Sequence, residues 1–217
     1  MSVAEALLEL DKEVVAVQVR ATDIDEETVE REHTPVVKRA VGSVFSLVRK
    51  YVPEAISSVK DYFSKRITYN LRPHHEDHVG GYFVPATDEL VVNTNMRKRN
   101  PMFYVESMYH EGRHALRKAL GSMENLYKGF VNEVGGFWAS ILYPMYEEGA
   151  TSRLTQMELG RTLDGYAPYR AGAEQVERDW GTRMLIYNKK DDAKRVLPSF
   201  LKGVNTWFAS NRVHIAA

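Results

Sequence analysis

The chain has 217 residues, of which 44% are hydrophobic, so it can bury a sizeable core, and its 29 basic and 29 acidic residues cancel. This balance argues against nucleic acid as a partner. The absence of cysteine excludes disulfides, thiol catalysis and thiolate metal ligands, so any metal must be bound by His, Asp or Glu. Acidic residues interrupt the apolar N-terminal stretch, and no run of about 18 apolar residues occurs. We therefore predict a cytoplasmic protein without a signal peptide or membrane segment.

Residues 1–66 are predicted to form a helical N-terminal lobe. Apolar residues recur at three- and four-residue spacing from Val36 to Val48, and Pro53 is placed to begin another helix that runs to about Ser64. Acidic residues and capping side chains favour a helix start near residue 25. Such a lobe could be purely structural or could act as a latency segment over an active site.

The composition changes at residue 67. Ile67–Tyr69 is a short β-prone run, and the polar segment His74–Gly81 is predicted to be a solvated loop, with a second metal site at its histidines as the less favoured alternative. Two short β-prone runs, Tyr82–Val84 and Glu89–Asn93, are separated by a turn-forming segment. They are predicted to form a β-hairpin.

A long helix is expected over residues 100–120. Asn100 is a good N-cap, Pro101 suits the first helical position, and Gly121 is a plausible stop. Residues 130–217 are predicted to be mostly helical. The chain is therefore expected to be an α+β protein dominated by helices. Residues 67–217 are expected to form one region. It would contain a small sheet or hairpin, then the long helix, then a helical C-terminal lobe.

The most informative motif lies within the long helix. His110, Glu111 and His114 spell His-Glu-x-x-His. Residues four apart on a helix share a face, so His110 and His114 can present two imidazoles to one metal ion, with Glu111 beside them as a general base. The motif therefore predicts a single catalytic Zn²⁺.

Zinc requires a third protein ligand. A third histidine in a longer motif is excluded, because Arg117 and Leu120 occupy the relevant positions. The downstream candidates are Glu148 and Glu133, with Glu147 or another group as a further alternative. Glu148 is favoured, because it lies on a predicted helical stripe that is otherwise mostly apolar, where a carboxylate would need a cation. The stripe consists of Val134, Trp138, Ile141, Met145, Glu148 and Ser152.

The chain resembles the gluzincin metallopeptidases in three short segments within residues 80–175. These are the His110–His114 motif, Glu148-Gly149-Ala150 and Pro168–Ala173. The second is similar to the Glu-Gly-x-Ala segment that carries the glutamate ligand in such enzymes. The third is similar to a Tyr-x-Lys-Gly-Ala segment whose tyrosine stabilises the oxyanion, although alanine replaces the lysine here. The spacing in the zinc aminopeptidases would instead favour Glu133 as the ligand.

The resemblance implies a zincin-like fold and a zinc metallopeptidase. Glu111 would act as general base and Tyr169 as oxyanion donor, with Tyr166 as the alternative donor. A peptide or protein substrate would add to the edge of the hairpin along Leu90–Asn95. The competing hypotheses are a catalytically inactive zincin fold that serves as a binding protein, and a zinc hydrolase of a non-peptide amide. Glu106 and Arg117 share roughly the metal face of the long helix. They could support the metal ligands or contact the substrate, but ordinary exposed charges are the favoured interpretation.

Overall fold

The computed structural model describes residues 17–74, 79–160 and 166–211. Its contacts divide the chain into two units, Met1–Ala115 and Leu116–Ala217. The predicted helical structure of residues 1–16, and the loop residues 75–78, lie outside the described residues.

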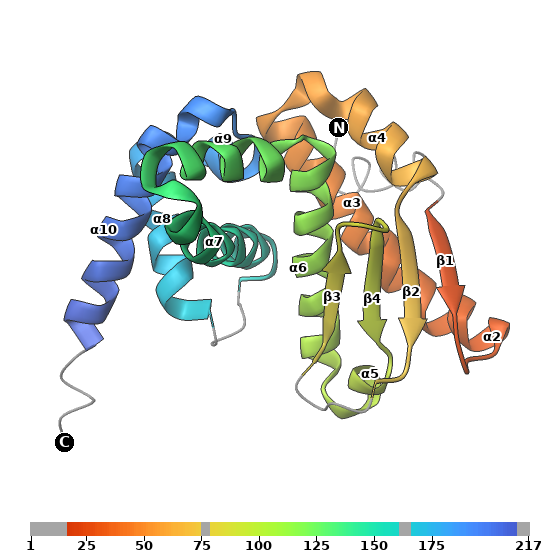
Figure 1. Cartoon of the computed structure of the whole chain (residues 1–217). Helices are drawn as coiled ribbons and strands as arrows, with labels where there is room; N and C mark the ends of the chain where they lie inside the picture. The colour runs from red at the N-terminus through yellow and green to blue at the C-terminus, as the bar shows by residue number, and fades with distance from the viewer. Residues whose placement is uncertain (1–16, 75–78, 161–165, 212–217) are drawn as a thin grey trace, which may run out of the picture. The chain divides into compact units, whose positions relative to one another are not determined.

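Unit 1 contains a small mixed sheet of four strands. The strands are β1 (Gln18–Ala21), β2 (Thr68–Arg72), β3 (Gly81–Val84) and β4 (Glu89–Asn93), and their order across the sheet is β1-β2-β4-β3 (Figure 1). The pairs β1–β2 and β2–β4 are parallel, whereas β3 is antiparallel to β4. The carboxyl ends of the three parallel strands therefore meet at one edge of the sheet.

The predicted β3–β4 hairpin is confirmed, but two details differ from expectation. β4 pairs on both sides, so Leu90–Asn95 cannot be the edge that receives a substrate strand, and β3 occupies that edge instead. Residues 18–21 form a strand within the segment expected to be helical. The hairpin forms between neighbouring runs of residues. The β1–β2 and β2–β4 pairs, which were not predicted, join strands that are further apart in the sequence.

The helical part of unit 1 begins at Asp25, whose carboxylate accepts a hydrogen bond from Thr28 N at 2.8 Å. The elements are α2 (Glu26–Thr28), the π-helix η1 (Val29–His33), α3 (Thr34–Tyr51), the 3-10 helix η2 (Pro53–Ala55), α4 (Ile56–Lys65) and α5 (Asn95–Arg99). Phe45 of α3 packs edge-to-face on Phe63 of α4, and both are buried. The predicted helices near residues 36–48 and 53–64 are confirmed.

Helix α6 (Pro101–Ala119) carries the His-Glu-x-x-His motif. Asn100 Oδ1 accepts a hydrogen bond from Phe103 N at 3.1 Å, and Gly121 adopts a φ of 67° just after the helix ends. Both end signals predicted from the sequence are therefore confirmed. At Gly112, α6 comes close to Val44 of α3 and Tyr69 of β2. This contact packs the motif helix against the core of unit 1.

Unit 2 is helical, as expected for the C-terminal lobe. It contains α7 (Ser122–Leu159), α8 (Ala167–Trp180), α9 (Arg183–Ile186), the 3-10 helix η4 (Lys190–Asp192) and α10 (Ala193–Asn211) (Figure 1). The kink in α7 lies at Gly135, with φ 81° and ψ 162°, and the helix continues through Pro144. The described residues thus form an α+β structure dominated by helices, as expected. Within the described ranges, no helix is long and apolar enough to cross a membrane.

Candidate metal centre

His110 and His114 are buried on one face of α6, with 4% and 7% of their surface exposed. Their Nε2 atoms lie 3.2 Å apart. Two imidazole nitrogens bound to one zinc ion at tetrahedral angles, each about 2.0–2.1 Å from the metal, would lie about 3.3 Å apart. The two side chains are therefore oriented as a chelating pair.

Glu148 of α7 completes a group of three potential ligands. One ligand atom from each of His110, His114 and Glu148 lies within 4.8 Å of the other two. Glu133 is exposed and does not belong to this group. The donor set of two imidazoles and one carboxylate is one that catalytic zinc sites use, with a fourth position left for water or substrate. These three residues could therefore hold a metal ion.

Glu147, the neighbour of Glu148, has a different environment. Its two carboxylate oxygens accept hydrogen bonds from Arg117 Nε at 2.9 and 3.0 Å, and Tyr143 donates its hydroxyl to Oε2 at 2.9 Å. Burial and the Glu147 charge both raise the pKa of Tyr143, which keeps this donor hydroxyl protonated. Glu147 is therefore held by Arg117, and Glu148 is the residue beside the histidines.

Two helix charges that were expected to be exposed are buried. Glu106 has 2% of its surface exposed, and Arg117 is completely buried. The expectation was wrong because the polar face of α6 is covered in the folded chain. Arg117 is covered within unit 2, where it contacts Glu147, Leu185 and Asn188.

The apolar stripe predicted for α7, on which Glu148 was favoured as a ligand, is not buried as a whole. Trp138 and Ile141 of the predicted stripe are 55% and 41% exposed, so this stripe does not form a continuous buried face of α7. The buried carboxylate on α7 is Glu147, with Tyr143 and Tyr146 on its side of the helix. From the periodicity, Glu148 was expected to be a carboxylate on an apolar face that needs a cation. In the structure this description fits Glu147, and the cation is Arg117.

Glu111 is 8% exposed and lies next to the outer strand of the sheet. Its Cγ atom is 3.7 Å from the position that a Cβ atom on Gly81 of β3 would occupy. The carboxylate proposed as a base therefore lies beside an edge strand, where an extended chain could add to the sheet.

Tyr169 is half-buried near the start of α8, and its backbone contacts α7. A Cβ atom on Gly149 would lie 2.6 Å from the carbonyl carbon of Tyr169. The Glu148–Ala150 and Pro168–Ala173 segments thus meet in the fold, although the oxyanion role of the Tyr169 hydroxyl stays a prediction. Tyr166, the alternative donor, immediately precedes α8.

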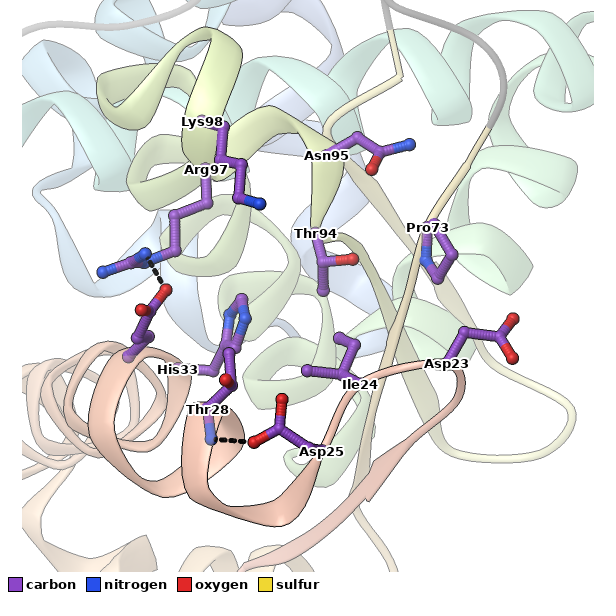
Figure 2. A pocket seen from close by; sticks show the side chains of 11 residues that line it. Asp23, Ile24, Asp25, Thr28, His33, Pro73, Thr94, Asn95, Arg97 and Lys98 are labelled. Atoms are coloured by element: carbon purple, nitrogen blue, oxygen red, sulfur yellow. Dashed lines mark hydrogen bonds and ion pairs between the residues drawn. The ribbon is translucent and has the colours of Figure 1, made fainter.

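A pocket of about 300 Å³ lies in unit 1 at the carboxyl ends of the parallel strands. Side chains after β1 and side chains from the β4–α5 segment line opposite sides of it (Figure 2). His33 at its wall is buried, and its Nδ1 atom is 2.5 Å from the hydroxyl of Tyr104. Burial, together with the nearby charge of Arg97, lowers the pKa of His33. No motif identified in the sequence pointed to this pocket.

No family model, curated protein or solved structure matches this chain.

Proposed function

We propose that the protein is a zinc-dependent metallopeptidase of zincin-like fold, with His110, His114 and Glu148 as the metal ligands. The observation that carries the proposal is the convergence of two buried imidazoles, 3.2 Å apart at Nε2, with a carboxylate from a second helix. The order of hairpin, motif helix and ligand-bearing helix supports the zincin-like assignment.

Zinc bound to this set supplies Lewis acidity, which polarises a carbonyl group and lowers the pKa of bound water towards 7. Glu111 is adjacent to His110 and takes a proton from the attacking water, then passes it to the amine that leaves. Because Glu111 is 8% exposed, its carboxylate is shielded from most competing solvent. Tyr169 is proposed to donate its hydroxyl to the oxyanion.

We place the substrate backbone along β3 and not along β4. β3 pairs only with β4 among the described strands, and its Gly81 lies beside Glu111. An extended peptide added to this edge would be fixed by main-chain hydrogen bonds, which a non-peptide amide cannot form repeatedly. This geometry favours a peptide as the substrate.

The proposal is tested by comparing wild-type protein with Glu111→Gln on a mixed peptide library, after the zinc content of each has been measured. Glu111→Gln should retain one zinc ion and lose at least about 100-fold in cleavage rate, as expected when a general base is removed. Glu133→Gln is the matched control, because Glu133 is an exposed carboxylate outside the ligand group. This control should retain both zinc and activity.

Two outcomes would contradict the proposal. Equal cleavage by Glu111→Gln and wild type would remove Glu111 from the mechanism. A wild-type protein that binds zinc but cleaves no peptide in the library would refute the peptidase assignment.

A further inference from the structure

A buried ion pair joins the two helices that carry the proposed metal ligands. Arg117 of α6 is completely buried, and Glu147 of α7 is 5% exposed. The Nε atom of Arg117 donates to both carboxylate oxygens of Glu147, at 2.9 and 3.0 Å. Both residues belong to unit 2, so the pair fixes α7 to the end of α6 within one compact unit.

Both members of the pair have additional partners. Arg117 Nη1 also donates to the Leu185 carbonyl and to Asn188 Oδ1, and the guanidinium lies 5.4 Å from the centre of the Tyr146 ring. Tyr143 donates its hydroxyl to Glu147 Oε2. These contacts restrain the Arg117 guanidinium on several sides, so the direction of its hydrogen bonds to Glu147 is well defined.

The sequence positions of the pair connect it to the metal ligands. Arg117 follows His114 by three residues on the continuous helix α6, and Glu147 directly precedes Glu148 on α7. Adjacent helical residues differ by about 1.5 Å in rise and about 100° in direction. Holding the Glu147 carboxylate against Arg117 therefore sets both the height and the rotation of the Glu148 backbone relative to α6.

We infer that Arg117 and Glu147 are positioning residues, which fix the register of α7 against the end of α6 and so set the direction in which the Glu148 side chain leaves α7. A buried ion pair is a poor means of gaining stability, since well-packed apolar residues often serve as well or better. Its directional bonds can instead specify one register between two helices. This inference rests on the proposed metal site, but it does not depend on peptide hydrolysis.

The test measures zinc dissociation constants by competition with a chromophoric chelator, alongside thermal melts and circular dichroism. Arg117→Lys retains the charge but lacks the planar fork that bonds Glu147 and Leu185 together. The double variant Arg117→Met with Glu147→Leu replaces the pair by apolar residues and leaves no unpaired buried charge. Each should lose about 10- to 100-fold in zinc affinity, the usual effect of removing a group that supports a ligand.

Arg153→Met is the matched control. Arg153 also lies on α7, but its guanidinium donates to Glu177 of α8 at 2.6 Å and bonds neither Arg117 nor Glu147. Its loss should lower the melting temperature while zinc affinity stays within about twofold of wild type. A general loss of stability is thereby separated from a loss of positioning.

The outcomes distinguish the inference from the proposed function. If wild type binds zinc tightly and Arg117→Lys and the double variant bind it equally well, the positioning role is refuted. If Arg153→Met loses as much affinity as they do, the effect is one of stability and the inference also fails. If wild type itself binds no zinc, the metal site is wrong. Should the double variant not fold, Arg117→Lys alone decides between these results.

Discussion

Gly149 should be intolerant of even a methyl group, because α8 crosses α7 at this residue. A Cβ atom there would lie 2.6 Å from the carbonyl carbon of Tyr169 and 3.2 Å from its Cβ atom, whereas ordinary contacts begin at 3.4 Å. The carbonyl oxygen of Tyr169 would be nearer still, so the Tyr169 backbone would have to retreat by at least about 0.8 Å. Because the obstructing atoms belong to a backbone, no side-chain rotation can relieve the overlap.

The cost of Gly149→Ala follows from two opposing effects. Overpacking typically costs about 1–3 kcal/mol, and a backbone obstruction favours the upper end of that range. Alanine in place of glycine within a helix returns about 1 kcal/mol. We therefore expect the free energy of unfolding to fall by about 2 kcal/mol, measured by urea denaturation followed by circular dichroism.

Gly136→Ala is the matched control for this prediction. Gly136 lies on the same helix, but nothing would come within 4 Å of an added Cβ atom. This substitution should raise the free energy of unfolding by up to about 1 kcal/mol. The two variants should thus differ in sign, and a Gly149→Ala protein as stable as Gly136→Ala would refute the close approach of α8 to α7.

The remaining predictions concern zinc and pH. Zinc at 100 times its dissociation constant should stabilise the protein by about 2.7 kcal/mol, or roughly 5–10 °C in a thermal melt. The variants His114→Ala and Glu148→Ala should abolish this shift in melting temperature. If Glu133→Ala abolishes it and Glu148→Ala does not, Glu133 is the third ligand. The lowered pKa of His33 means that the unfolded chain binds more protons than the folded chain between that pKa and about 6.5. Stability should therefore fall as pH decreases from about 6.5 through the folded pKa. In urea denaturation, His33→Gln should lose less stability than wild type between pH 7.5 and 5. If the variant and the wild type show the same dependence of stability on pH, His33 is not buried in its neutral form.

The features that the sequence predicted correctly depend on neighbouring residues. Asn100 caps α6 by bonding to Phe103 N, three residues away, and Gly121 supplies the left-handed conformation that follows the helix. The β3–β4 hairpin likewise forms between adjacent runs of β-prone residues. Turn and cap preferences act over a few residues, so they are visible in the sequence before any tertiary contact is known.

The features that were missed depend on distant partners. β1 has only four residues, and it pairs with β2, whose residues lie 50 positions further along the chain. β4 also pairs with β2, which moves the open edge to β3. The hydrophobic pattern of a short strand does not identify its neighbours, so neither the order of the strands nor the edge strand of the hairpin could be derived from it.

The choice between Glu147 and Glu148 shows the same limit at the site itself. The two carboxylates are adjacent and chemically identical, and only their directions on α7 distinguish them. That direction is set by Arg117, a residue 30 positions earlier, whose guanidinium binds Glu147. The same contact satisfies the buried Glu147 carboxylate, and Glu148 is the glutamate that belongs to the group with the two histidines. The third ligand of the proposed metal site is therefore determined by which glutamate the buried arginine binds.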